Sequence, residues 1–168
     1  MSWDDDLYTC PHCNRDDLVL ASGSKRSEIL VIGEFPGAEE VKKGKPMIGA
    51  MGGVLRTELG RVGLDMNQMR LCNLWLHPKN KSEDCLNYGL QKAIEEARNR
   101  KAILLIGSDT VKQFCNEKVS EVTGLEVKSP YFSAPLVFAC VQPATVFHRS
   151  IGELRLSLEK FSKKVKGG

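Results

Sequence analysis

The stretch Leu30–Gly53, LVIGEFPGAEEVKKGKPMIGAMGG, decides both the fold and the site of this protein. An apolar run ends at Gly33, Pro36 stiffens the turn that follows, and a second tight turn occupies residues 44–49. Glycine lets the backbone approach a ligand closely. Because open α/β sheets bind ligands at the carboxyl ends of their strands, this loop is predicted to be the floor of an active site.

Apolar runs alternate with helical patterns along the rest of the chain. Strands are predicted at residues 28–32, 68–76, 102–106 and 136–141, and helices at residues 49–60, 83–99, 107–117 and 151–166. Ser82 is a predicted N-cap, and residues 119–133 are predicted to form a hairpin or a loop. Four buried strands separated by helices predict a mostly parallel sheet that is covered on both faces.

Length and composition limit the class of protein. A chain of 168 residues is expected to form one domain, residues 1–168. The net charge is +3, and the lysines near the C-terminus suit either a polyanion or a solvated helix end. No apolar run is long enough to span a bilayer and the first residues are acidic, so we expect a cytoplasmic protein without membrane contact.

Five motifs appear in a fixed order. They are Gly33–Glu40, Gly44–Gly49, Asn73 at a strand end, Ile103–Ser108, and Gln142–Val146. Together they closely resemble the uracil-DNA glycosylase superfamily over nearly the whole chain, and the iron–sulfur-bearing family-4 members most of all. The resemblance implies a three-layer α/β/α sandwich on a four-stranded parallel sheet. It also implies hydrolysis of the bond between base and sugar in a deoxyribonucleotide extruded from DNA.

Base excision places negative charge on the departing base, so the site must donate hydrogen bonds to it. The resemblance implies that the backbone N–H groups of Glu34 and Phe35 do so. Phe35 stands where classical members carry an aspartate, which makes Glu40 or Glu39 the candidate carboxylate; either could instead be a solvated loop residue. The amide of Asn73 would separate uracil from cytosine, or else close an Asx turn.

Two positions depart from the family pattern. Met47 replaces a phenylalanine that stacks on the base, and Gln142 replaces a histidine. Glutamine still donates an N–H, but it carries no charge. His148 could take over that role or be an exposed residue, and Arg149 could contact a phosphate.

The predicted site residues fall into three groups. The catalytic candidates are Glu34, Glu40, Gln142 and His148. The substrate-binding candidates are Gly33, Phe35, Pro36, Gly37, Met47 and Asn73. The DNA-binding candidates are Gly52 at a helix start, Arg56 and Arg149, with the lysines of residues 79–81 as a further phosphate contact or a solvated loop.

Cysteine spacing predicts a metal site. Cys10 and Cys13 form a CxxC half-site, and six cysteines in a cytoplasmic chain favour metal ligands or buried thiols over disulfides. The resemblance completes the site with Cys85, and with His77 where the family has a cysteine. The resemblance implies that they bind a [4Fe–4S] cluster; zinc is the alternative, because three cysteines and one histidine suit a tetrahedral site. Either metal would fix the segment 1–26 to the body.

The other cysteines are assigned to the interior. Cys72 neighbours Asn73 on a strand and is expected to point to the opposite face. Cys115 and Cys140 lie in apolar surroundings and are predicted to be unreactive thiols of the core.

Three hypotheses for function follow. The first is a monomeric DNA glycosylase acting on DNA that contains uracil or a related modified pyrimidine. The alternative is a catalytically weak or inactive glycosylase-like protein that binds DNA or assists replication. A nucleotide-binding α/β protein of another kind is disfavoured, because no Gly-rich phosphate loop opens a helix directly after the first strand.

Overall fold

The computed structural model describes residues 8–143 and 151–167. Four strands form one sheet: β1 (Ile29–Gly33), β2 (Arg70–Asn73), β3 (Ala102–Ile106) and β4 (Leu136–Cys140). Their spatial order is β2-β1-β3-β4, and every neighbouring pair is parallel. The predicted parallel sheet is therefore confirmed.

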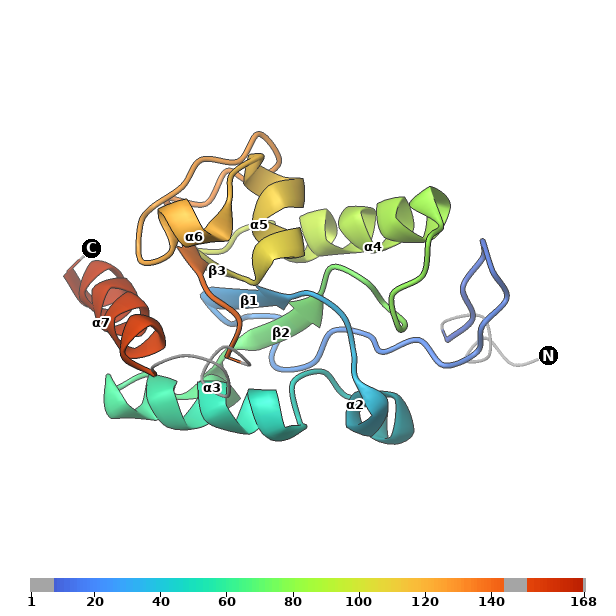
Figure 1. The fold of residues 1–168 in the computed structure, drawn as a ribbon, viewed down its shortest axis with the longest axis horizontal. Coiled ribbons are helices and arrows are strands. Elements are labelled where there is room, and N and C mark those ends of the chain that lie inside the picture. The colour runs from blue at the N-terminus through green and yellow to red at the C-terminus, as the bar shows by residue number, and fades with distance from the viewer. Residues whose placement is uncertain (1–7, 144–150, 168) are drawn as a thin grey trace.

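Helices cover both faces of this sheet (Figure 1). The helices are α2 (Ala38–Lys43), α3 (Ala50–Arg61), α4 (Glu83–Glu96), α5 (Ser108–Cys115), α6 (Val119–Val122) and α7 (Gly152–Gly167). Helices α4 and α5 pack on one face, and α3 and α7 pack on the other. This arrangement is the predicted three-layer sandwich.

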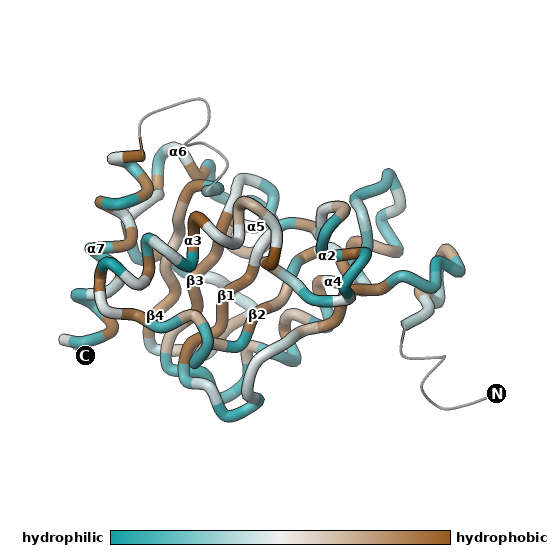
Figure 2. Tube along the Cα trace, turned by 90° about the horizontal axis from the view of Figure 1, so that it is seen from below, coloured by the Kyte–Doolittle hydropathy of each residue, from teal (hydrophilic) through white to brown (hydrophobic). Residues whose placement is uncertain are grey.

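The strands are apolar on both sides because each side contacts a helix layer. Leu30 and Ile32 of β1 pack toward α4 and α5, whereas Val31 packs toward α3 and α7. All three side chains are completely buried. Figure 2 shows the same pattern along the chain trace, with hydrophobic strands in the middle and hydrophilic segments outside. A continuous apolar run is thus the expected signature of a central parallel strand.

Several predicted boundaries were wrong for identifiable reasons. The predicted strand 68–76 is shorter, because a 3₁₀ helix (Met66–Gln68) takes its start and β2 ends at Asn73. Leu74 and Trp75 beyond it stay apolar because they are buried outside the sheet. The predicted helix 83–99 ends early, since Asn99 has a left-handed conformation with φ 61°.

Short helices account for the other differences. Helix α2 lies in a charged stretch for which no element was predicted, and none of its residues is buried. Helix α6 occupies part of segment 119–133, which was expected to be a hairpin or a loop. Neither segment has an apolar periodicity long enough to be distinguished from a loop.

The segment before β1 docks along the outer edge of the sheet. Ser22 forms an antiparallel bridge with Leu71 of β2, and the Val19 N–H donates to the carbonyl of Leu76 at 2.6 Å. Leu18 and Val19 are buried. This docking covers the exposed edge of β2 and brings the N-terminal cysteines toward the body. Among the helices within residues 8–143 and 151–167, none combines the length and apolar character needed to cross a membrane.

An ion-pair cluster joins β2 to the end of α4. Glu96 accepts hydrogen bonds from Arg70 Nε at 2.7 Å and Nη2 at 2.9 Å, and Arg100 Nη2 lies 3.3 Å from the same carboxylate. Both arginines are buried. The hydrogen bond from Arg70 holds the pKa of Glu96 below its ordinary value of 4.5.

We predict that Glu96→Gln lowers the free energy of unfolding at pH 7 by about 2 kcal/mol, between the values typical of exposed and buried pairs. A carboxylate whose pKa is lowered by folding stabilises the fold above its ordinary pKa, and this contribution is lost as the pH falls. The difference between wild type and variant should therefore shrink below pH 4.5. Urea unfolding across pH measures it.

The neighbouring exposed Glu95→Gln is the matched control, because Lys92, at 3.9 Å, is the one charged partner of the Glu95 carboxylate in the described part of the chain. It should change the free energy of unfolding by less than about 0.5 kcal/mol. Equal effects of the two substitutions would contradict the role assigned to the cluster.

Candidate active site and candidate metal centre

A pocket lies at the carboxyl ends of the four strands, where the sequence predicts it. Its volume is about 330 Å³, within the range of small-ligand sites. Gly33 of β1, Asn73 of β2, Ile106 of β3 and Gln142 after β4 all contribute to its wall. The remaining lining residues are Glu34, Phe35, Gly37, Ala38, Glu39, Glu40, Met47, Gly49, Ala50, Met51, Gly52, Leu55 and Pro143.

The deepest contact joins the ends of β1 and β2. Gly33 pairs with Asn73, and a Cβ at position 33 would lie 2.6 Å from Asn73 Oδ1 and 3.1 Å from Met47 Cε. Glycine is therefore required for the Asn73 side chain to reach across β1 toward Met47. Asn73 is buried and lines the pocket, and among the described residues its carboxamide has no hydrogen-bond partner.

The chain after Asn73 does not form an Asx turn. Such a turn needs the Asn73 side chain to accept the N–H of Trp75. That N–H instead donates to the carbonyl of Glu34 at 2.8 Å, and the Leu74 N–H donates to the carbonyl of Gly33 at 2.8 Å. The Asn73 carboxamide thus remains available to a ligand.

Glu34, in the motif after β1, is hydrogen-bonded to Gln142, in the motif after β4. Its Oε1 accepts from Gln142 Nε2 at 2.8 Å, and its Oε2 accepts from the Asp109 N–H at 3.0 Å. Burial raises the pKa of Glu34, and the hydrogen bond from Asp109 opposes that rise. Gly107 leaves room for this carboxylate, because a Cβ there would lie within 2.3 Å of Glu34 Oε1.

Glu40 ties the two glycine turns together. Its Oε1 accepts from the Gly37 N–H at 2.9 Å. Its Oε2 accepts from the N–H groups of Ile48 at 3.2 Å and Gly49 at 2.5 Å. The carboxylate lines the pocket, but three backbone groups hold it in place.

Met47 occupies the pocket wall in an unusual conformation. Its φ is 58°, in the left-handed region that non-glycine residues rarely adopt. Helix α3 packs directly against this residue, since a Cβ on Gly52 would lie 2.0 Å from the Met47 carbonyl oxygen. The pocket mouth carries two exposed apolar side chains, Phe35 and Met51.

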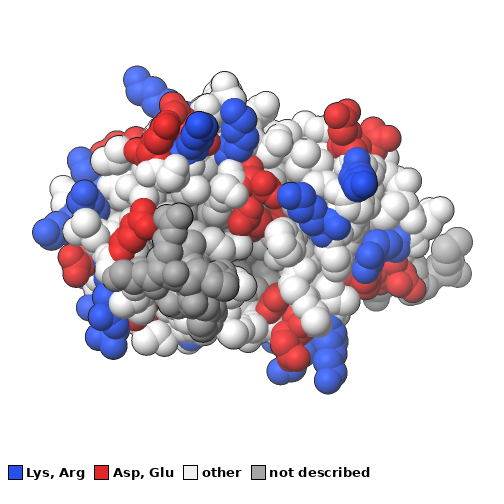
Figure 3. Space-filling view, in the orientation of Figure 1, with Lys and Arg blue, Asp and Glu red and all other residues white. Residues whose placement is uncertain are grey.

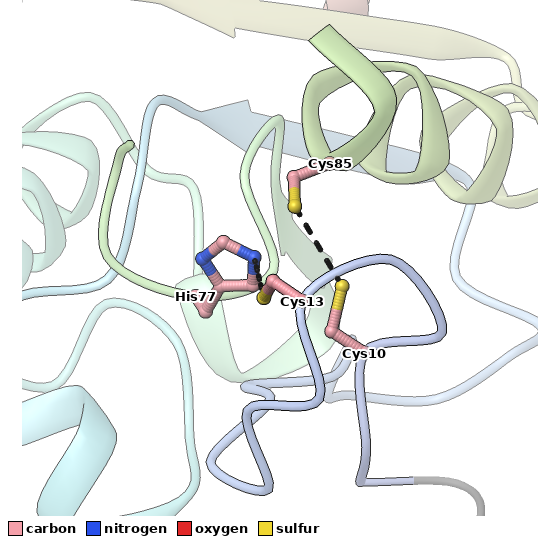
Figure 4. Close-up of side chains that lie close together, drawn as sticks. All are labelled: Cys10, Cys13, His77 and Cys85. Carbon is pink, nitrogen blue, oxygen red and sulfur yellow. Dashed lines mark hydrogen bonds between the residues drawn. The ribbon is translucent and has the colours of Figure 1, made fainter. Parts of the chain in front are cut away.

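Four side chains converge in a second place (Figure 4). Cys10 and Cys13 lie on the N-terminal turn, His77 follows β2, and Cys85 lies in the first turn of α4. Their ligand atoms all lie within 4.8 Å of one another. Three thiols and one imidazole are a donor set for a metal ion.

Hydrogen bonds from neighbouring groups orient His77 and lower the pKa of Cys85. His77 Nδ1 lies 2.8 Å from the carbonyl oxygen of Pro78, which fixes the proton on Nδ1 and directs Nε2 toward Cys13. Burial alone would raise the pKa of Cys85, but hydrogen bonds with nearby side chains lower it to about 6. These partners are Ser82, Asn80, His77 and Cys10.

The remaining cysteines lie apart from this group. Cys72 is buried outside the set of four, and burial raises its pKa to about 12. Cys140 is also completely buried, with its pKa raised to about 12. Cys115 is partly buried, and burial raises its pKa to about 11. The raised pKa values are those of unreactive thiols.

Comparison with known proteins identifies the family. The model of the uracil DNA glycosylase superfamily matches residues 20–165. The chain belongs to this superfamily. It is 30% identical to a type-4 uracil-DNA glycosylase of Pyrobaculum aerophilum over 128 residues, covering 68% of this chain and 65% of the relative. It is 26% identical to one of Archaeoglobus fulgidus over 179 residues, covering 95% and 88%.

A third relative matches over a shorter region. A type-4 uracil-DNA glycosylase of Thermotoga maritima is 36% identical over 66 residues, which is 39% of this chain and 34% of the relative. The match therefore spans less than two thirds of the length of the Thermotoga and Pyrobaculum proteins.

The predicted substrate-binding residues line the pocket, except for Pro36. Pro36 is buried without lining it. Arg56 is exposed on α3, outside the pocket lining, and donates to Asn67 Oδ1 at 2.6 Å. His148 and Arg149 lie outside the described residues.

Sequence reasoning missed the residues that hold Glu34 in this superfamily member. Gly107 lies beside this carboxylate at the N-cap of α5, and the backbone N–H of Asp109 in the first turn of α5 donates to it. The sequence does carry one signal for this contact: a glycine directly after the third apolar run, followed by the start of a helix. Because a helix N-terminus attracts a carboxylate, this pattern predicts an acidic side chain such as Glu34 beside it.

We predict that Glu40→Ala lowers the free energy of unfolding by about 2 kcal/mol, because three backbone N–H groups lose their acceptor. Urea unfolding measures the change. The matched control is Glu39→Ala. Glu39 is exposed, and its carboxylate is as far as 4.0 Å from the Lys43 ammonium, so its loss should lower the free energy of unfolding by less than about 0.5 kcal/mol. A variant of Glu40 as stable as wild type would show that the carboxylate does not support the turns.

Proposed function

We propose that this protein is a DNA glycosylase that hydrolyses the bond between base and sugar of uracil, or of a related modified pyrimidine, in DNA. The observation that carries the proposal is the Asn73 carboxamide, which lies in the pocket beside the Gly33–Gly37 turn and has no hydrogen-bond partner within residues 8–143 and 151–167. A carboxamide donates and accepts at once, which suits the pairing edge of a pyrimidine. Superfamily membership and the named activity of the relatives support the same reaction.

The target nucleotide must leave the DNA stack before the pocket can hold its base. Gly33 and Gly37 provide a close backbone approach, and the N–H groups of Glu34 and Phe35 are the proposed donors to a base carbonyl. The Met47 side chain is the proposed cover for one face of the base, as a flexible replacement for an aromatic ring.

Charge separation in the transition state assigns the remaining roles. As the bond breaks, the sugar becomes positive and the base negative. Gln142 is the proposed donor to the departing base, positioned by its hydrogen bond to Glu34. The Glu34 carboxylate is the proposed partner for the positive sugar or for the attacking water. Glu40 remains a catalytic candidate, with a second role in holding the turns.

DNA contact is proposed at the pocket mouth rather than over a broad basic face. Figure 3 shows positive and negative side chains interspersed on the visible face. Gly52, near the start of α3, is the proposed phosphate contact in the pocket lining. Arg56 on the same helix, outside that lining, and Arg149, outside the described residues, are the other proposed phosphate contacts. The exposed Phe35 and Met51 could pack against bases next to the extruded nucleotide.

The metal centre is proposed as a structural element that fixes the N-terminal segment, residues 1–26. The resemblance implies a [4Fe–4S] cluster, with zinc as the alternative. One domain over residues 1–168, a monomeric state and a cytoplasmic location remain part of the proposal.

The central test is excision from an oligonucleotide with a single deoxyuridine, read as strand cleavage after alkali. Wild type should cleave, and Asn73→Ala should lower the rate by about 100-fold or more, because a donor aimed at the departing base is lost. Asn73→Asp retains the size of the side chain but cannot donate, so it should lose activity while remaining folded.

The control is Asn87→Ala, since Asn87 is exposed on α4 and does not line the pocket. It should cleave like wild type. Binding of the oligonucleotide by wild type without cleavage would favour the alternative, a glycosylase-like protein that does not excise.

A second test restores the histidine of the family. Gln142→His should raise the excision rate by about tenfold, because hydrogen bonds from a charged donor are stronger. The gain should disappear as the pH rises well past roughly 6.5, the ordinary pKa of imidazole. Gln91→His on the exposed face of α4 is the control and should change nothing. A Gln142→His variant no faster than wild type at any pH would refute the donor role.

A further inference from the structure

We infer that the metal centre binds one tetrahedral zinc ion, and not the [4Fe–4S] cluster that the resemblance implies. The ligands are Cys10, Cys13, His77 and Cys85. The inference rests on the separations of their donor atoms, so it does not depend on the proposed glycosylase activity.

The measured separations are those around a single ion. With Zn–S bonds of about 2.3 Å and Zn–N bonds of about 2.0–2.1 Å, tetrahedral angles place two sulfurs about 3.8 Å apart and a sulfur and a nitrogen about 3.5 Å apart. Cys10 Sγ and Cys85 Sγ are 3.8 Å apart, and Cys13 Sγ and His77 Nε2 are 3.5 Å apart. These two pairs use all four ligands.

An iron–sulfur cube does not fit between the same atoms. In a [4Fe–4S] cluster each protein ligand binds a different iron at a corner, so the ligands are separated by the width of the cluster. Sulfur atoms 3.8 Å apart are nearly in contact, and four iron and four sulfide atoms have no room between them. All four donor atoms lie within 4.8 Å of one another, so the mismatch affects the whole site.

The surroundings of the ligands also suit one zinc ion. Three thiolates with one imidazole form a common structural zinc site. His77 Nδ1 bonds to the carbonyl of Pro78, and zinc-bound histidines commonly donate their other ring N–H to such a carbonyl. Asn80 Nδ2 lies 3.7 Å from Cys85 Sγ and donates toward it, which compensates part of the thiolate charge. The donor atoms, their separations and the hydrogen bonds that hold them together meet the requirements for a zinc site.

The test uses the full chain, produced with both iron and zinc supplied and purified without oxygen. Elemental analysis should find about one zinc per chain, without stoichiometric iron or sulfide. X-ray absorption at the zinc edge should fit three sulfurs at about 2.3 Å and one nitrogen at about 2.0–2.1 Å. Four irons and four sulfides per chain, with a brown absorption, would overturn the inference, as would folded protein that binds neither metal.

Two histidines in this region provide the matched pair. His77→Ala should weaken zinc binding by at least about 100-fold in competition with a chromophoric chelator. His12→Ala should not, because His12 is exposed and lies outside the ligand set. If His77→Ala fails to fold, His77→Cys should retain one zinc with four sulfurs at about 2.3 Å. A nitrogen ligand that persists in either His77 variant would refute the assignment.

Excision is measured on the same samples so that two failures can be separated. Zinc-loaded protein without excision would refute the proposed function and leave the zinc inference standing. Protein that excises uracil and contains an iron–sulfur cluster would support the proposed function and refute the zinc inference.

Discussion

The close approach of Asn73 to Gly33 is the constraint on which the rest of the site depends. A Cβ at position 33 would lie 2.6 Å from the carboxamide oxygen, so the glycine that ends β1 makes room for the asparagine of β2 in its present position. The chain beyond each strand continues the pairing, with N–H groups of Leu74 and Trp75 bonded to the carbonyls of Gly33 and Glu34. The first turn and the asparagine are thereby fixed as one unit.

The metal centre lies on the same stretch of chain, because His77 follows Asn73 by four residues. A metal ion bound there would join that segment to Cys85 of α4 and to the N-terminal turn, and would restrict how far residues 73–77 can move. The inferred zinc ion would perform this task as well as a cluster, since the requirement is a fixed distance between three segments. Zinc adds no redox chemistry, and the proposed hydrolysis of the bond between base and sugar needs none.

The sequence determined the sheet and the pocket more fully than the contacts within them. Apolar runs predict central strands because both faces of the sheet are covered, as for Leu30, Val31 and Ile32. CxxC spacing and the family resemblance predict four metal ligands, and the structure brings these four side chains together. The pairing of Glu34 with Gln142 was not predicted, because it joins residues 108 positions apart and has no local signature. The three backbone bonds to Glu40 were missed for the same reason, since turn geometry decides which N–H groups face a carboxylate.

The two departures from the family pattern have different structural weight. Met47 has a left-handed φ of 58°, and α3 packs closely against its backbone through Gly52. The backbone of the turn therefore sets the direction of the side chain at position 47. A change of side chain at this position alters the wall of the pocket while the backbone path is retained. Gln142, in contrast, meets a carboxylate whose pKa is raised by burial. A neutral amide stabilises the charged form of Glu34 less than an imidazolium would, so glutamine in place of histidine changes the charge of the pair at the proposed active site. The consequences of Gln142 for the rate should therefore exceed those of Met47.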